Sequence, residues 1–200
     1  MAIPDKMKAV VLMGKNHLEV KEMPTPQPGP QDVLVKVEAT AVCGSDVALI
    51  EEPWEAQPPY GSFIIGHEYA GTIAAVGETV DELQVGDRVA VEASLGCGRC
   101  RNCRLGNYTA CLNYGNLKRG HRANGFTTNG GFAQYALNHI NTVHKIPETI
   151  EFNEAADKMG VDVMRWMYCN HKPEQNLLFG YHRADEVRRQ FLIPLWNVYN

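Results

Sequence analysis

Four cysteines at short, regular intervals near the middle of the chain carry the clearest chemical signal in this 200-residue sequence. They are Cys97, Cys100, Cys103 and Cys111, in the pattern C-x2-C-x2-C-x7-C. Tetrahedral zinc takes four such thiolates at about 2.3 Å, and closely spaced cysteines can reach one ion through local curvature of the backbone. We therefore predict a closed, structural zinc site in this segment.

Two other uses of these cysteines compete with zinc. An iron–sulfur cluster could use three cysteines at this spacing, but the bacterial ferredoxin run ends in C-x3-C-P. Here the fourth cysteine lies further along the chain and is followed by Leu112. Disulfides are disfavoured because the first residues lack the apolar stretch of a signal peptide, so we expect a cytoplasmic protein with reduced thiols.

A second set of potential metal ligands lies upstream. Cys43 follows a predicted strand, and His67 and Glu68 stand where another strand is expected to begin. A thiolate, an imidazole and a carboxylate from separate loops could form a site with an open position for water or substrate. On spacing alone the signal is weak, since a lone cysteine at the end of a strand is usually a small buried apolar residue.

The elements that must position these residues are mostly strands. Short apolar or alternating runs, separated by Gly- and Pro-containing turns, predict a barrel or sandwich. The runs cover residues 7–11, 18–20, 33–42, 69–76, 88–91 and 132–137. Beyond them, apolar residues recur at spacings of three and four over 154–169 and 184–199, which predicts two helices packed by their apolar faces. The expected fold is mainly β with a helical tail, divided into domains 1–153 and 154–200.

Composition excludes several classes of protein. With 44% hydrophobic and 21% charged residues, the chain can bury a core and is not disordered on composition. Its net charge of −4 lacks the basic surplus of a nucleic-acid binder. No apolar run approaches the length of a transmembrane helix. We therefore expect neither nucleic acid nor membrane as a partner.

Five motifs in order resemble a known family. They are VCGSD at 42–46, GHEYAG at 66–71, VGDRV at 85–89, the four-cysteine segment, and NGGFAQY at 129–135. This succession resembles the zinc-dependent medium-chain alcohol and polyol dehydrogenases, in particular the sorbitol, threonine and butanediol dehydrogenase branch. The resemblance extends over about residues 7–156.

The resemblance implies a GroES-like β-barrel with a structural-zinc lobe. It implies Cys43 and His67 as ligands of a catalytic zinc, with Glu68 as a third ligand or a close neighbour. Ser45 would bond the substrate hydroxyl and begin the proton relay. The chemistry implied is oxidation of a small-molecule alcohol or polyol by hydride transfer to NAD or NADP, with zinc as the Lewis acid.

The sequence departs from that family in three places. The residue five positions after Cys43, often a relay histidine, is Ala48. The Glu-Pro or Cys that completes or gates the catalytic zinc is missing after 152–156, so we expect weak zinc binding there. No G-x-G-x-x-G dinucleotide fingerprint occurs. We thus expect a domain inactive alone, which self-associates through an exposed interdomain face; the alternative is a non-catalytic, zinc-stabilised interaction module.

The tail resembles a different family. Residues 154–200 are similar to isoleucyl-tRNA synthetase, in the helical stretch that leads into the anticodon-binding region. Neither ATP-site signature of that family is present, so aminoacylation is not implied. Because the two resemblances meet at 154–156, the sequence predicts a chimera of a dehydrogenase domain and a synthetase fragment.

Overall fold

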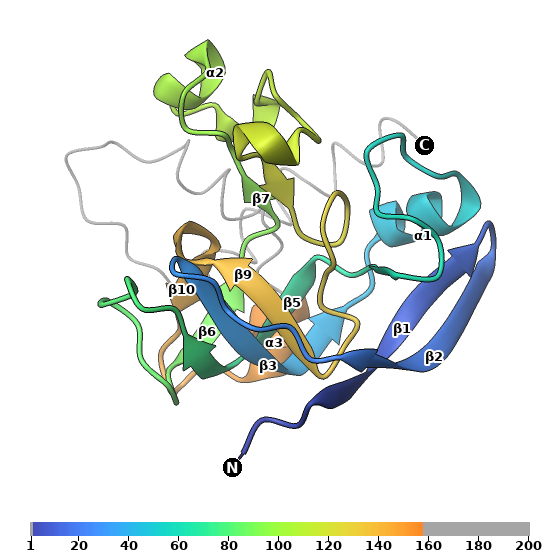
Figure 1. Ribbon diagram of the computed structural model, residues 1–200. Coiled ribbons are helices and arrows are strands. Elements are labelled where there is room, and N and C mark those ends of the chain that lie inside the picture. Colours follow the sequence, from blue (N-terminus) through green and yellow to red (C-terminus); the bar gives the residue numbers. More distant parts are fainter. Residues whose placement is uncertain (1, 158–200) are drawn as a thin grey trace, which may run out of the picture. The chain divides into compact units, whose positions relative to one another are not determined.

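The computed structural model describes residues 2–157, and these form a mainly β structure (Figure 1). The strands are β1 (Lys6–Gly14), β2 (His17–Pro24), β3 (Asp32–Ala41), β4 (Phe63–Ile64), β5 (Glu68–Val76), β6 (Arg88–Val91), β7 (Ser94–Leu95), β8 (Arg122–Ala123), β9 (Tyr135–His139) and β10 (Val143–Lys145). The helices are α1 (Gly44–Glu51), α2 (Arg101–Arg104) and α3 (Phe152–Asp157), with short 3₁₀ turns η1 (Tyr108–Ala110), η2 (Leu117–Arg119) and η3 (Ile140–Thr142).

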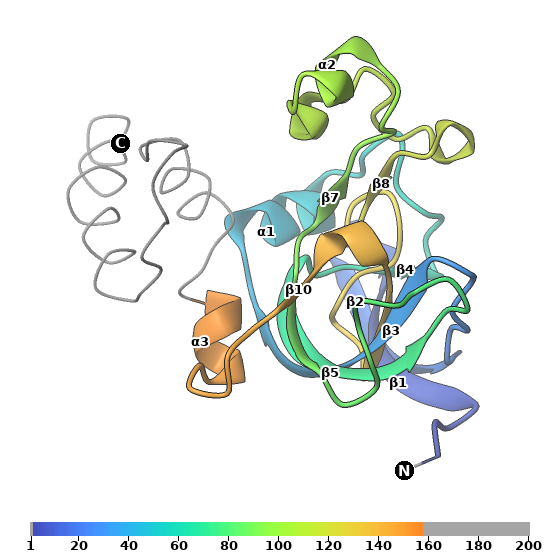
Figure 2. The same ribbon diagram turned by 90° about the vertical axis from the view of Figure 1, so that its left-hand side faces the viewer.

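A curled five-stranded antiparallel sheet forms the main body (Figure 2). Its order is β10-β6-β5-β3-β9, with Val35 of β3 paired to Ile73 on one side and to Ala136 on the other. β-Branched residues suit such pleated, buried surfaces. The curvature gathers the main core, made of Val33, Val35, Tyr69, Ile73, Leu83, Val89, Val91, Ala136 and Val143.

A smaller sheet of order β2-β1-β4 is joined to this body by the segment just before β9. The Val10 amide donates to the Phe132 carbonyl (2.8 Å), and the Val37 amide donates to the Gln134 carbonyl (3.0 Å). The strand expected over 132–137 therefore begins as a strand only at Tyr135, since its first residues bridge β1 and β3 instead.

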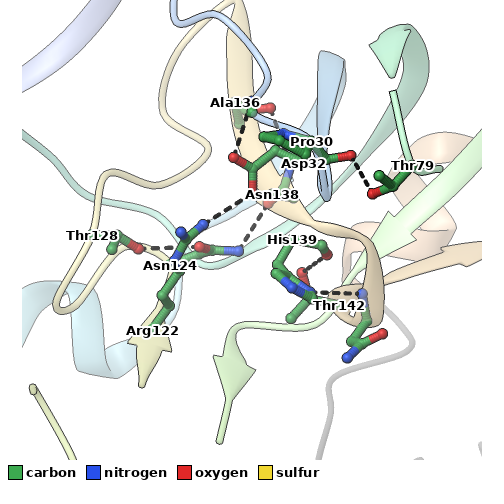
Figure 3. Close-up of polar contacts among 12 residues, drawn as sticks. Pro30, Asp32, Thr79, Arg122, Asn124, Thr128, Ala136, Asn138, His139 and Thr142 are labelled. Carbon is green, nitrogen blue, oxygen red and sulfur yellow. Dashed lines mark hydrogen bonds and ion pairs between the residues drawn. The ribbon is translucent and has the colours of Figure 1, made fainter. Parts of the chain in front are cut away.

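Polar contacts, most of them buried, fix the long segment between β6 and β9 to the main sheet (Figure 3). Asn138 of β9 accepts hydrogen bonds from the Tyr69 hydroxyl (2.5 Å) and from the Asn124 amide (2.8 Å). Arg122 of β8 donates to Asp32 at the start of β3 (3.0 Å). Most buried polar groups in proteins are paired in this way, so the network anchors the base of this segment at a defined position.

The prediction of a mainly β fold is confirmed. The expected strands from 7 to 91 each correspond to an observed strand, whereas α1 and the two- or three-residue strands were not anticipated. Helix α3 begins at Phe152, two residues before the start expected for the first tail helix. The rest of that helix, the second predicted helix and the synthetase-like sequence from residue 158 on lie outside the described residues. Within residues 2–157, no helix is both long and apolar enough to cross a membrane.

Candidate metal centres

The four cysteines meet at one point, in the segment between β7 and β8. We call this segment, residues 96–121, the cysteine lobe. The sulfurs of Cys97, Cys100, Cys103 and Cys111 all lie within 4.8 Å of one another. Two pairs, Cys97–Cys103 and Cys100–Cys111, are 3.9 and 4.0 Å apart. Sulfurs bound tetrahedrally to one zinc at about 2.3 Å lie about 3.8 Å apart, so the donor set fits a closed zinc site.

Backbone and side-chain amides stabilise negative charge on these sulfurs. The Cys103 amide donates to the Cys100 sulfur (3.4 Å), and the Asn113 side chain donates to the Cys97 sulfur (3.1 Å). Mainly through the Asn113 hydrogen bond, the pKa of Cys97 falls to about 5. Burial is the main cause that raises the pKa of Cys103 to about 12. A cation bound among the four sulfurs would favour the thiolate form of each.

A second, more open cluster brings together Cys43, His67 and Glu68. Their ligand atoms lie within 4.8 Å of one another. Cys43 immediately precedes α1, and Glu68 begins β5, so the chain brings the ends of two neighbouring strands of the curled sheet together. Three protein ligands leave a tetrahedral ion one position for water or substrate, which is the arrangement that a catalytic metal requires.

Ser45 reaches into this cluster from the first turn of α1. Its hydroxyl donates to the Cys43 sulfur (3.2 Å) and lies 3.1 Å from Nε2 of His67. The hydroxyl oxygen therefore stands between the thiol and the imidazole. A serine at that place can exchange a proton with a group bound beside the two ligands.

Asp46 is a further residue of the centre, which the sequence analysis did not single out. Its fully buried carboxylate lies 3.1 Å from Nδ1 of His67 and accepts the Cys43 amide at 2.9 Å. A carboxylate on Nδ1 leaves Nε2 as the nitrogen available to a metal and fixes the orientation of the ring. Asp46 thus positions two ligands at once.

The electrostatics of His67 follow from these contacts. Burial lowers its pKa, but the hydrogen bonds and negative charge of Asp46, together with those of Cys43, outweigh burial, so the pKa is raised from its ordinary value. The site therefore attracts positive charge to the imidazole. A metal cation would satisfy that preference in place of a proton.

Close backbone packing behind His67 explains the glycines of two motifs. Gly66 has φ of +91°, a region that favours glycine. A Cβ on Gly130 would lie 1.9 Å from the Gly66 carbonyl oxygen, which accepts the Gly131 amide at 2.8 Å. The segment 129–131 therefore supports the backbone that carries His67.

Aromatic rings lie against the open cluster on one side. The Phe126 ring is 4.4 Å from that of His67, and the Trp54 ring is 5.2 Å from Phe126. Trp54 is 40% exposed. Beyond it, the Tyr114 ring lies 6.4 Å away and packs on the buried His121, whose pKa is lowered by burial. These rings can contact the carbon skeleton of a bound molecule.

Every site residue named from the sequence lies in one of the two clusters. The four cysteines form one, and Cys43, Ser45, His67 and Glu68 form the other. Asp46 could have been found as an acidic residue three positions after a cysteine that precedes a helix, a spacing that lets its side chain cap the helix. Trp54 and Phe126 carry no comparable signal, because only the fold brings them beside His67.

The chain also resembles known proteins. Residues 29–148 match the model of the alcohol dehydrogenase GroES-like domain. Sorbitol dehydrogenase of Bacillus subtilis strain 168 is 36% identical over 164 residues, which cover 77% of this chain and 42% of that protein. The chain thus spans less than half the length of this curated relative.

Two solved structures resemble the chain. A zinc-binding dehydrogenase from Sinorhizobium meliloti 1021 bound to NADP is 33% identical, with a TM-score of 0.66 over 76% of this chain and 42% of the other. A thermostable alcohol dehydrogenase from Pyrobaculum aerophilum with cobalt and zinc bound is 31% identical, with a TM-score of 0.66 over 76% and 44% of the two chains.

Proposed function

We propose that this chain, which belongs to the alcohol dehydrogenase GroES-like domain family, supplies the metal-binding catalytic half of a zinc-dependent alcohol or polyol dehydrogenase. Hydride transfer would go to NAD or NADP, as the NADP-bound relative suggests. The substrate proposed is a small alcohol or polyol, since a relative is a sorbitol dehydrogenase. Zinc at the open cluster would supply the Lewis acidity that lowers the pKa of the bound hydroxyl.

The observation that carries this proposal is the arrangement around His67. We assign Cys43, His67 and Glu68 as ligands of the catalytic zinc, and Ser45 and Glu68 as catalytic residues. The Ser45 hydroxyl stands between two of the ligands at hydrogen-bond distance from each, and the buried Asp46 aligns the same two. A non-catalytic barrel would need neither the serine nor the buried carboxylate, so this geometry favours an enzyme over an interaction module.

The proton of the alcohol is proposed to leave through Ser45. Ala48, an exposed residue one turn further along α1, offers no titratable group to continue a relay. Since Ser45 itself is half-buried, its proton can pass to water directly. The reaction therefore depends on the position of one hydroxyl rather than on a chain of side chains.

The cysteine lobe is assigned a structural role. Cys97, Cys100, Cys103 and Cys111 supply a closed set of four sulfurs, and a closed set leaves no position for substrate. We propose that it holds a second zinc and keeps this irregular segment folded. Metal binding in such sites supplies much of the local folding free energy.

We propose a domain boundary near residue 153, with the nicotinamide site outside the 200 residues. The division of the chain into compact units after Ala156 supports the boundary. For residues 154–200 we keep the proposal of an isoleucyl-tRNA synthetase fragment joined to the dehydrogenase domain, which rests on the sequence resemblance. A cytoplasmic location is proposed because five of the six cysteines lie in the two metal centres as free thiols.

A fusion experiment tests the catalytic proposal. Residues 1–153 are joined to the nucleotide-binding part of a dehydrogenase relative, and alcohol-dependent formation of NADH or NADPH is measured with sorbitol, threonine and 2,3-butanediol. We expect turnover in the fusion and its loss in the same fusion with His67→Ala. A folded, zinc-loaded fusion without activity on any of these alcohols would contradict the proposal.

A further inference from the structure

Among Lys, Arg, Asp and Glu, the cysteine lobe contains only the basic residues. Residues 93–147 contain no Asp or Glu, although the whole chain has a net charge of −4. Within the lobe, five basic side chains are exposed: Arg99, Arg101, Arg104, Lys118 and Arg119. None of the five forms an ion pair with another residue of the described part of the chain. The acidic excess of the molecule therefore lies elsewhere.

The tip of the lobe combines this charge with apolar surface. Arg101, Arg104 and Leu105 stand three and four positions apart around the single turn of α2, so they share one face. Leu105 is 67% exposed. Leu112, which follows the last cysteine, is equally exposed. A surface of this kind, with an exposed leucine beside two arginines that form no ion pair, fits an acidic protein surface that has apolar side chains of its own.

The loop between β5 and β6, residues 77–87, offers the complementary surface. Glu78, Asp81 and Glu82 are exposed, and no ion pair to them occurs within residues 2–157. Val85 beside them is 63% exposed. The loop thus presents three carboxylates and one apolar side chain, which match the arginines and leucine of the lobe tip.

The acidic loop is held in a fixed conformation. The Thr79 hydroxyl donates to the Pro30 carbonyl at 2.8 Å (Figure 3), and the Gly77 amide donates to the Asp32 carbonyl at 2.8 Å. The Leu83 side chain is buried in the core. A preformed surface loses little conformational entropy when it binds, which favours its use as a contact.

The two surfaces lie at opposite ends of the described structure. In both Figure 1 and Figure 2, α2 projects from one end, and the loop between β5 and β6 lies at the other. They therefore cannot neutralise each other within one molecule. A contact between them must join two molecules.

We propose that the basic tip of the cysteine lobe, Arg101, Arg104 and Leu105, docks on the acidic loop, Glu78, Asp81 and Glu82, of a second copy of this chain. The contact is head-to-tail, so it closes into a ring or extends into a chain of copies. A second copy is favoured over a nucleic acid, because exposed leucines add nothing to phosphate binding and the acidic remainder repels a long polyanion. This interface goes beyond the proposed catalysis and uses none of its residues.

Sedimentation velocity of the zinc-loaded, full 200-residue chain at low and high salt tests the interface. We expect association at 50 mM NaCl that weakens at least about tenfold at 500 mM, because salt screens exposed charges. Arg101→Glu/Arg104→Glu should remove it at low salt, and so should Asp81→Lys/Glu82→Lys. Lys6→Glu/Lys15→Glu, on β1 and the turn that follows it, makes the same change in net charge as the arginine variant, is its matched control and should leave association intact.

Mixing the two charge-reversed variants gives the decisive result. Each variant alone should lack the salt-sensitive association, whereas the mixture should regain it, since the acidic tip of one now faces the basic loop of the other. Zinc content of each variant checks that the lobe remains folded. A monomeric wild type, association that salt does not weaken, or a mixture that stays monomeric would overturn the proposal. Arginine-dependent binding of an oligonucleotide without self-association would overturn it as well.

Discussion

Single side chains decide how firmly the open cluster can hold a metal. Asp46 is buried and accepts from both Cys43 and His67. An amide in its place could accept one of these hydrogen bonds but would direct a donor at the other partner. The two ligands would then lose their common support, although both would still be present.

We therefore expect Asp46→Asn to weaken zinc binding at the open cluster about 10- to 100-fold, the usual effect of removing a carboxylate behind a histidine ligand. Competition against a chromophoric chelator measures this affinity. Asp87→Asn is the matched control, because it removes another partly buried, paired carboxylate away from both centres. Equal zinc affinity in Asp46→Asn and the wild type would show that Asp46 does not position the ligands.

The cysteines of the lobe should differ in reactivity once zinc is removed. The Asn113 hydrogen bond lowers the pKa of Cys97 to about 5, whereas burial raises that of Cys103 to about 12. A pH of 6 lies above the pKa of Cys97, so this thiol is ionised, and below the pKa of Cys103, so that thiol is protonated. Since the thiolate is the nucleophile, we expect iodoacetamide to alkylate Cys97 first.

Peptide mass spectrometry of samples quenched just after chelation at pH 6 measures the two alkylation rates. Zinc-loaded protein serves as the control and should protect both residues. Asn113→Ala should slow alkylation of Cys97 at this pH, because it removes the hydrogen bond that lowers the Cys97 pKa most. Similar rates at both cysteines in the metal-free chain would contradict the assignment.

At the scale of elements, glycines let two loops cross closely behind the metal ligands. The Gly130→Ala change would place a Cβ 1.9 Å from the Gly66 carbonyl oxygen, next to His67. We expect a loss of about 1–3 kcal/mol in the free energy of unfolding, typical of overpacking, together with weaker zinc binding at the open cluster. Chemical denaturation and zinc titration measure the two effects.

Gly14→Ala is the control for this change, since a Cβ there meets no atom within 4 Å. It should alter stability little and leave both metal centres unaffected. If Gly130→Ala behaved in the same way, segment 129–131 would not support His67 as the structure indicates.

The extent to which sequence predicts these elements depends on their length. Strands such as β3 and β5 carry enough alternating or apolar residues to be recognised, and both were predicted. β4, β7 and β8 have two residues each, too few for any periodicity. The candidate ligands of the open cluster could be named because their motifs resemble a known family, and those of the lobe because of the spacing of the cysteines. Phe126 could not be named, since its contact with His67 arises from the fold.

At the scale of the whole molecule, the proposed reaction needs more than these 200 residues. Hydride transfer requires the nicotinamide to lie near the alcohol carbon, at roughly 3–3.5 Å, and the sequence has no dinucleotide fingerprint to hold it there. We expect no oxidation of sorbitol, threonine or 2,3-butanediol by the 200-residue chain with either cofactor. Absorbance at 340 nm measures it, with the fusion described above as the positive control. Saturable NADH binding by this chain would contradict the expectation.

The number of zinc ions per chain tests the central claim most directly, since the catalytic role and the structural role are each assigned to a separate zinc centre. Native mass spectrometry of the zinc-supplemented protein should find two zinc ions per chain, one of them lost first under mild chelation. Cys43→Ser/His67→Ala should retain one, held tightly, whereas Cys103→Ser should lose the tight site and loosen the lobe. A folded chain without zinc, or one in which the Cys43→Ser/His67→Ala variant binds as many ions as the wild type, would contradict the account.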